Sequence, residues 1–105
     1  MRDRLQSRKC ARYLKALADP DRLKIIQCLQ GGPKTVTELS KLLEKELANV
    51  SHHLGVMRHA DLVRDEKEGK YVVYSLNPEI FRRRRRPDRI GEVVDLGCCR
   101  LALGK

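Results

Sequence analysis

Signals that start and stop helices follow one another closely in the first half of this chain, and their order limits the fold more than any other feature. Asp19-Pro20 is typical of a helix N-terminus, and Gly31-Gly32-Pro33 ends the helix that begins there. Thr35 with Glu38 three residues later fits a capping box, in which the two side chains satisfy otherwise unpaired N–H groups. The sequence therefore predicts two short helices, the second of which ends near Glu44.

The spacing of apolar residues adds one helix before this pair and one after it. Over about residues 3–17 the apolar side chains recur at helical spacing and make one stripe, consisting of Cys10, Tyr13, Leu14 and Leu17. From about Ala48 to Ala60 a second stripe consists of Leu47, Val50, Leu54 and Met57. The opposite face of that helix carries short or polar side chains, namely Ala48, His52, Gly55, Val56 and His59.

Two strand-like runs follow the last of these helices. Leu62–Arg64 and Tyr71–Leu76 are rich in β-branched and aromatic residues, and Asp65–Lys70 joins them as a hairpin with Gly69 available for positive φ. Asn77-Pro78 then marks a turn. Helices followed by a hairpin are the order of a winged helix-turn-helix, a mostly α fold with a small β-hairpin (α+β).

We expect residues 1–81 to form this domain and residues 82–105 to form a basic linker and tail, because 105 residues is the usual size of one domain. The tail opens with Arg82–Arg86, a run that either contacts flanking phosphates or is a solvated spacer. Beyond it the pattern fits both a helical face and strand alternation, and Gly97 with Val93-Val94 favours extended structure. Dimerisation or sensing is the expected role of the tail.

The composition indicates a polyanionic partner. The formal net charge is +9, and each phosphate that Lys or Arg neutralises releases condensed counterions. Charge alone is weak support, because five of these charges lie in the arginine run and the rest of the chain interleaves acids with bases. With no Trp and a single Phe, the chain has few rings to stack on bases, which disfavours single-stranded nucleic acid.

The sequence also predicts where the protein works. No apolar stretch approaches the roughly 20 residues that span a bilayer, and the N-terminus has no apolar signal-peptide region. We therefore expect a cytoplasmic protein without a membrane partner.

The helix that follows the second turn carries the candidate base readers. In a helix-turn-helix the second helix enters the major groove and reads base edges mainly from its N-terminal residues. Asn49, Ser51 and His52 are the candidates, Gly55 allows close approach, and the cationic neighbours suited to phosphates are Lys45 and Arg58. The competing interpretation is a solvated helix face. His53 lies on the flank of the apolar stripe, so packing is favoured over base contact.

The hairpin tip is a candidate wing. Lys67 and Lys70 flank Gly69 and would lie along the DNA backbone or minor groove, while Glu66 and Glu68 reduce the local charge. A plain solvated turn remains the alternative for each of these side chains.

Several motifs in this order make the chain similar to a known family. They are Ala16 to Ile25, Glu38-Leu39, Asn49 to Leu54, Leu62-Val63 and Tyr74-Ser75-Leu76. Together they resemble the ArsR/SmtB family of repressors over about residues 12–77. The resemblance implies a homodimeric winged-helix protein that binds operator DNA and leaves it when an inducer, often a metal ion or metalloid, is bound.

The chain departs from the family pattern at its sensor positions. The arsenic-type site has cysteines in a Cys-Val-Cys context where this chain has Thr35-Val36-Thr37, and the zinc-type site needs a C-terminal His, which is absent after His59. Glu46 stands where the family has a small capping residue, which leaves the start of the reading helix open. The three histidines are spaced i+1, i+6 and i+7, which does not suit a shared ion on one helix.

The cysteines are the remaining sensor candidates. Cys98 and Cys99 are adjacent and could chelate a thiophilic ion such as trivalent arsenic, with Cys10 as a third donor, because family dimers pair the first helix with the C-terminal segment. Packing of small side chains at a dimer interface and a redox switch are the alternatives. Without framework spacing we expect free thiols rather than structural disulfides, and Cys28 is expected in the core.

Taken together, the residues predict a sequence-specific regulator of double-stranded DNA, a homodimeric repressor with an inverted-repeat operator. No cofactor is required, and trivalent arsenic is a candidate inducer at the cysteines. A protein-interaction module is the first rival, because a fold does not by itself determine function. An enzyme is the second and weaker rival, because the sequence has no paired nucleophile and base, phosphate loop or metal motif.

Overall fold

Local capping signals set the starts of two of the helices of this protein. The computed structural model describes residues 6–81 and 93–103. Its helices are α1 (Ser7–Leu17), α2 (Pro20–Leu29), α3 (Val36–Leu43) and α4 (Leu47–His59). Asp19 accepts hydrogen bonds from the N–H groups of Asp21 and Arg22, and Thr35 and Glu38 form the predicted capping box. The predicted helix starts at Asp19-Pro20 and Thr35 are therefore confirmed.

The wing is a longer hairpin than the sequence predicts. β2 (Val63–Glu68) pairs antiparallel with β3 (Tyr71–Leu76), and Gly69 at φ 61° with Lys70 makes the turn between them. The predicted hairpin and its turn at Gly69 are confirmed, but the connection is shorter than predicted, because residues 65–68 belong to β2. Residues 64–68 of β2 are exposed on both faces of the strand. They therefore show no alternation of apolar and polar residues from which a strand could be predicted. The two-residue strand β1 (Lys34–Thr35), which is too short to leave a pattern, completes the sheet in the order β1-β3-β2.

The core lies where α2, α3 and α4 meet beneath the sheet. Its fully buried side chains come from these helices, from α1, from the start of the wing and from the C-terminal segment, and include Leu17, Ile25, Ile26, Leu39, Val50, Leu54, Met57, Leu62 and Val94. Two residues of the predicted stripes lie outside it. Leu47 is 53% exposed because it is the first residue of α4, and Leu14 is 38% exposed on α1, whose inner side is formed by Tyr13, Ala16 and Leu17.

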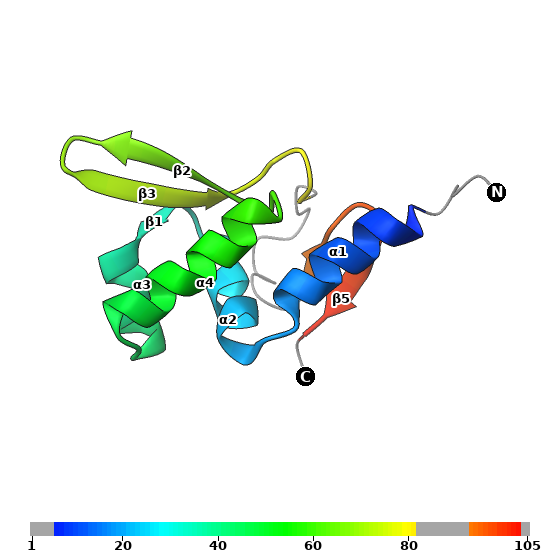
Figure 1. Cartoon of the computed structure of the whole chain (residues 1–105), viewed down its shortest axis with the longest axis horizontal. Coiled ribbons are helices and arrows are strands. Elements are labelled where there is room, and N and C mark those ends of the chain that lie inside the picture. Colours follow the sequence, from blue (N-terminus) through cyan, green and yellow to red (C-terminus); the bar gives the residue numbers. More distant parts are fainter. Residues whose placement is uncertain (1–5, 82–92, 104–105) are drawn as a thin grey trace.

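The C-terminal segment forms a second, two-stranded sheet beside α1 (Figure 1). β4 (Val93–Asp95) pairs antiparallel with β5 (Arg100–Ala102), and Gly97 at φ 83° lies between them. Extended structure was the favoured prediction and is confirmed for these strands. Val94 and Leu96 are buried in the same core cluster as the helices, and the Gln30 amide donates to the Val93 carbonyl at 2.8 Å.

The arginine run Arg82–Arg86 and residues 87–92 lie outside the described residues. Within the described part of the chain, no helix has the length and apolar character needed to cross a membrane.

Candidate nucleic-acid interface and sulfur centre

The turn between α3 and α4 is closed by backbone and side-chain hydrogen bonds. Glu44 ends α3 in the left-handed region at φ 56°, and the Lys45 N–H donates to the Ser40 carbonyl at 3.1 Å. The Ser40 hydroxyl also donates to the Lys45 carbonyl. The Glu46 side chain does not cap α4, which begins at Leu47. This turn holds α3 and α4 in the arrangement of a helix-turn-helix.

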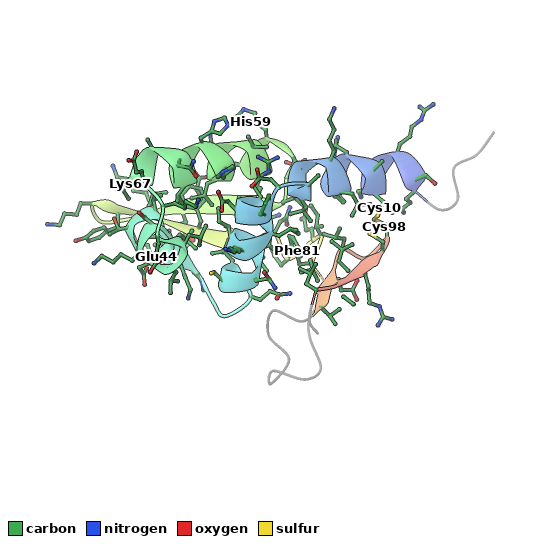
Figure 2. The ribbon with its side chains drawn as sticks, turned by 90° about the horizontal axis from the view of Figure 1, so that it is seen from below. Cys10, Glu44, His59, Lys67, Phe81 and Cys98 are labelled. Carbon is green, nitrogen blue, oxygen red and sulfur yellow. A yellow bond between two sulfur atoms is a disulfide. The ribbon has the colours of Figure 1, made fainter. Side chains whose placement is uncertain are left out.

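The predicted base readers all lie outside the buried stripe of α4. Asn49, Ser51 and His52 are exposed, and a Cβ added at Gly55 would meet nothing within 4 Å. Figure 2 places His59 on the outer side of the same helix, where its Nδ1 lies 2.8 Å from the Gly55 carbonyl. The side chains at the start of α4 are thus free of the core and open to a partner.

The two cations predicted to meet phosphates are paired within the chain. Arg58 Nη1 donates to Asp65 Oδ2 at 3.1 Å, which joins α4 to the wing, and Lys45 Nζ lies 4.0 Å from Asp21 Oδ2. The Arg58, Asp65 and Lys45 side chains are all more than a third exposed, so solvent screens both ion pairs and a phosphate can exchange with either carboxylate. No pattern in the sequence predicts that Arg58 pairs with Asp65.

The predicted wing residues lie at the tip of the hairpin. Lys67 and Lys70 are exposed, and Figure 2 shows Lys67 at the end of the molecule remote from α1. Tyr71 and Val72 on the facing strand are also exposed. The wing therefore presents cations and some apolar surface beyond the edge of the core.

His53 connects the reading helix to the N-terminus of α2. It is 8% exposed, as expected for a packing residue. Its Nδ1 lies 3.2 Å from Arg22 Nη1, and its Nε2 lies 3.7 Å from Asp21 Oδ2 and 3.9 Å from Asp19 Oδ1. Arg22 also donates from Nε to the Ala16 carbonyl at 2.5 Å. Sequence reasoning found the burial of His53 but missed these partners, because they belong to a different helix.

The same group offers a metal ion three donor atoms within 4.8 Å of one another, from Asp19, Asp21 and His53. Arg22 always carries protons, so His53 Nδ1 must accept from it and Nε2 must hold the ring proton that faces the carboxylates. A metal on Nε2 would need the opposite tautomer, with Nδ1–H pointing at the Arg22 guanidinium. The arrangement therefore fits an ion-pair and hydrogen-bond network better than a metal site.

The Asp19 carboxyl group in this network is held ionised. Hydrogen bonds from the backbone, with that of the Arg22 N–H the strongest, lower the pKa of Asp19 below its ordinary value, although partial burial opposes the shift. The carboxylate thus remains charged at the N-terminus of α2, where the helix dipole favours negative charge.

Three cysteine sulfurs meet between α1 and the C-terminal strands. Cys10 and Cys98 form a disulfide across 88 residues of sequence, and Figure 2 shows this bond joining α1 to the C-terminal pair of strands, β4 and β5. The expectation of free thiols is wrong for these two residues. The pairing depends on packing of β4 and β5 against α1, and residue spacing does not reveal that packing.

Cys99 completes the cluster as a free thiol. Its Sγ lies 2.9 Å from Cys10 Sγ, and the three sulfurs lie within 4.8 Å of one another. Burial raises the pKa of Cys99, and the neighbouring Asp95 carboxylate raises it further. Cys28 in α2 is also free, packs against the core, and has a pKa raised by burial. The predicted grouping of Cys10 with the vicinal pair thus corresponds to a spatial cluster we call the sulfur centre.

Sequence comparison relates the chain to transcriptional regulators. The family described as Helix-turn-helix domain matches residues 17–66. The chain is 33% identical to the transcriptional repressor SdpR of Bacillus subtilis, over 64% of this chain and 74% of SdpR. It is 36% identical to the arsenical resistance operon repressor of the same species, over 69% of this chain and 70% of that protein.

Solved structures show the same arrangement of helices and wing. Reduced HlyU from Vibrio cholerae matches with a TM-score of 0.66 and 38% identity, over 69% of this chain and 76% of HlyU. The homodimeric winged helix-turn-helix DNA-binding domain of Mb0332 from Mycobacterium bovis matches with a TM-score of 0.65 and 28% identity, over 75% of each chain. Turn, reading helix and wing thus correspond to those of a DNA-binding fold.

Proposed function

Because the chain belongs to the ArsR/SmtB family of winged helix-turn-helix transcriptional regulators, we propose that it acts in the cytoplasm as a homodimeric repressor of an inverted-repeat operator. The family is one of DNA-binding regulators rather than enzymes. The observation that carries the proposal is the open face of α4 with Asn49, Ser51 and His52 exposed at its start. Two such helices in a dimer would enter successive major grooves, roughly 34 to 36 Å apart.

Each exposed residue has a role that follows from its chemistry. Asn49 is suited to an adenine edge, while Ser51 and His52 donate and accept within a small space. Gly55 leaves room for the DNA backbone, because no side chain fills the space beside it. Lys45 and Arg58 would contact phosphates after releasing Asp21 and Asp65.

The wing would add contacts that do not depend on sequence. Lys67 and Lys70 lie beyond the core on an exposed hairpin, where their charges can approach the phosphates or the minor groove. Glu66 and Glu68 flank Lys67 in β2 and limit the net attraction to the phosphates. We assign the wing a positioning role and the start of α4 the reading role.

The sulfur centre is the proposed inducer site. Cys10, Cys98 and Cys99 supply three soft donors within 4.8 Å, a set suited to trivalent arsenic or another thiophilic ion once the thiols are free. A relative that represses an arsenical resistance operon supports this class of inducer. An inducer releases DNA when it binds the DNA-incompetent state more tightly than the competent one.

Residues 1–81 would then bind DNA, and the tail of residues 82–105 would carry two of the three sensor cysteines, with Cys10 supplied by α1. Val94 and Leu96 hold this tail on the core, so a change at the sulfur centre acts on a segment packed against the DNA-binding domain. Release of the operator would follow from movement of β4 and β5 against α1.

The test is fluorescence anisotropy of the purified protein with its own promoter region and with random duplex DNA. The double variant N49A/H52A should lose at least about 10-fold in affinity for the promoter, since even one good base contact contributes about 1–3 kcal/mol. Its affinity for random DNA and its melting temperature should remain close to those of the parent, because both side chains are exposed.

A matched control is K24Q, which changes an exposed residue of α2 without a proposed role in DNA binding. It should bind promoter DNA like the parent. Equal losses by N49A/H52A on both DNAs would remove the two residues as readers. Absence of any selective binding by the parent would favour a protein-interaction module over the repressor.

A further inference from the structure

The sulfur centre contains one cysteine that can pair with either of two others. Cys10 is 8% exposed on α1, and it is bonded to Cys98 while Cys99 Sγ lies 2.9 Å from its own sulfur. The two C-terminal cysteines follow the bend at Gly97, and a hydrogen bond of 2.9 Å from the Leu96 N–H to the Cys99 carbonyl closes that bend. The backbone thus presents both C-terminal sulfurs to Cys10.

The disulfide and a three-sulfur ligand set use the same atoms. Trivalent arsenic as arsenous acid binds three thiols with loss of three waters and with no change in its oxidation state. In the structure two of the three donors are already joined to each other, and only the Cys99 thiol is free. A metalloid can therefore occupy the full set only after the disulfide is reduced.

We propose that the sulfur centre is a redox-gated ligand site: the Cys10–Cys98 disulfide blocks trivalent metalloid binding, and its reduction opens a site made by Cys10, Cys98 and Cys99. This inference rests on the proposed inducer site and adds the condition under which that site responds. Oxidation and metalloid binding are then mutually exclusive states of one centre, with opposite requirements for the same sulfurs.

The chemistry of the gate balances with a hydroperoxide as oxidant and a dithiol as reductant. One thiolate attacks the peroxide, forming a sulfenic acid and releasing an alcohol or water; the second thiol displaces water to form the disulfide. In the reverse direction a dithiol is oxidised to its own disulfide as Cys10 and Cys98 regain their protons.

Cys99 gives the oxidised state an internal exchange. Once deprotonated, its sulfur can attack Cys10 Sγ, form a Cys10–Cys99 bond and release Cys98 as the leaving thiolate, with no net change in oxidation. Either disulfide consumes two of the three donors, so exchange leaves the gate closed. A variant without Cys98 should therefore still close through Cys99.

The gate is tested by titrating arsenite into reduced protein, peroxide-oxidised protein and oxidised protein that a dithiol has reduced again, with all reagents removed by desalting. Arsenic retained per chain is measured by elemental mass spectrometry, and free thiols are counted. We expect the reduced form to hold one arsenic and the oxidised form to bind more than about 100-fold more weakly, because two of three chelating donors are gone. Reduction should restore binding.

Peptide mapping identifies the bonds. Oxidised parent should show Cys10 linked to Cys98 or Cys99, and oxidised C98S should show Cys10 linked to Cys99. C28A is the matched control: it removes the free cysteine of α2, which lies outside the cluster, and should behave as the parent. A disulfide that includes Cys28, or an oxidised C98S without a Cys10–Cys99 link, would contradict the assignment.

The outcomes separate this inference from the proposed inducer. Arsenite binding of equal strength by oxidised and reduced protein overturns the gate and leaves the inducer in place. A reduced protein that binds no arsenite overturns the inducer and the gate together, while DNA binding, measured separately, stays as proposed.

Discussion

The helical body with its wing and the C-terminal strands are held in different ways. The body buries a continuous set of side chains from α2, α3 and α4, including Ile26, Leu39 and Leu54 at 0% exposure. The C-terminal segment buries Val94 and Leu96 in that core, accepts a hydrogen bond from Gln30 at Val93, and is tied to α1 by the Cys10–Cys98 disulfide. The body is stabilised mainly by its buried core, while the C-terminal strands combine a smaller apolar contact with a bond that redox chemistry can break.

The wing tip and the sulfur centre lie apart. Lys67 of the wing and the Cys10–Cys98 pair are toward opposite ends of the long dimension of the molecule (Figure 2), which extends 47 Å. An inducer at the sulfur centre would therefore act on DNA binding through the packed elements between them. α1 is one connection, because it carries Cys10 and places Arg12 Nη2 4.0 Å from Asp61 Oδ2 beyond the end of α4.

The largest expected effect comes from breaking the body. L54A should lower the free energy of unfolding by about 3 kcal/mol, because it removes a fully buried side chain and leaves a cavity. Urea unfolding followed by circular dichroism measures the change. L42A is the control, since Leu42 is 58% exposed on α3 and should change stability by less than about 0.5 kcal/mol. Similar losses in both variants would contradict the location of the core.

A smaller loss is expected from the C-terminal anchor. V94A should cost about 2 kcal/mol, since each methyl group removed contributes about 0.8 kcal/mol and the side chain is fully buried. The measurement is the same unfolding curve, taken with the disulfide intact. A102S, at an exposed position of β5, should be nearly neutral. If V94A were also neutral, β4 and β5 would not unfold together with the helical body, and burial of Val94 would not hold them in place.

Within the body, the Asp19 cap should contribute less than either core residue. D19A should lower stability by about 1 kcal/mol near neutral pH, because two N–H groups of α2 lose their acceptor. The folded pKa of Asp19 lies below its ordinary value of 3.8, so the ionised cap is fully stabilising above 3.8 and its contribution is lost as pH falls through the folded pKa. The difference in stability between parent and D19A should therefore narrow in acid, as the part of the cap that depends on ionisation is lost.

D19N is the matched control for this cap. Asn accepts the same backbone hydrogen bonds, so D19N should keep most of the stability and lose the acid dependence that belongs to Asp19. A gap between parent and D19A that stays constant down to acid pH would show that ionisation of Asp19 does not contribute.

The smallest expected effect on stability comes from the wing tip. K67A and K70A should change the free energy of unfolding by less than about 0.5 kcal/mol, because both side chains are exposed. Each should reduce the slope of log affinity against log salt by about one on any duplex DNA. E66A is a control of opposite charge. A loss of affinity for the operator without a loss for random duplex DNA would instead show that the lysines contact bases.

Much of the body could be predicted because its signals are local. The Asp19 cap, the Thr35–Glu38 capping box and the period of α4 involve residues within a few positions of each other, and the structure contains all three. The length of β2 was missed for the converse reason: a strand solvated on both faces has no apolar alternation to read.

The candidate sites divide along the same line. Exposure of Asn49, Ser51 and His52 follows from their position outside the apolar stripe of α4, and the sequence alone could predict it. The pairing of Arg58 with Asp65, and of His53 with Arg22, joins different elements and has no signal in residue spacing.

By itself, the sequence determined the helices, their order, the presence of the hairpin and the exposed side of α4, because hydrogen bonding and periodicity over short distances set these features. Only the tertiary structure decided where residues 93–103 pack. Val94 and Leu96 bury themselves beside α1, and this brings Cys98 and Cys99 to Cys10 across 88 residues. Contacts of such separation depend on how whole elements pack, which no local pattern specifies.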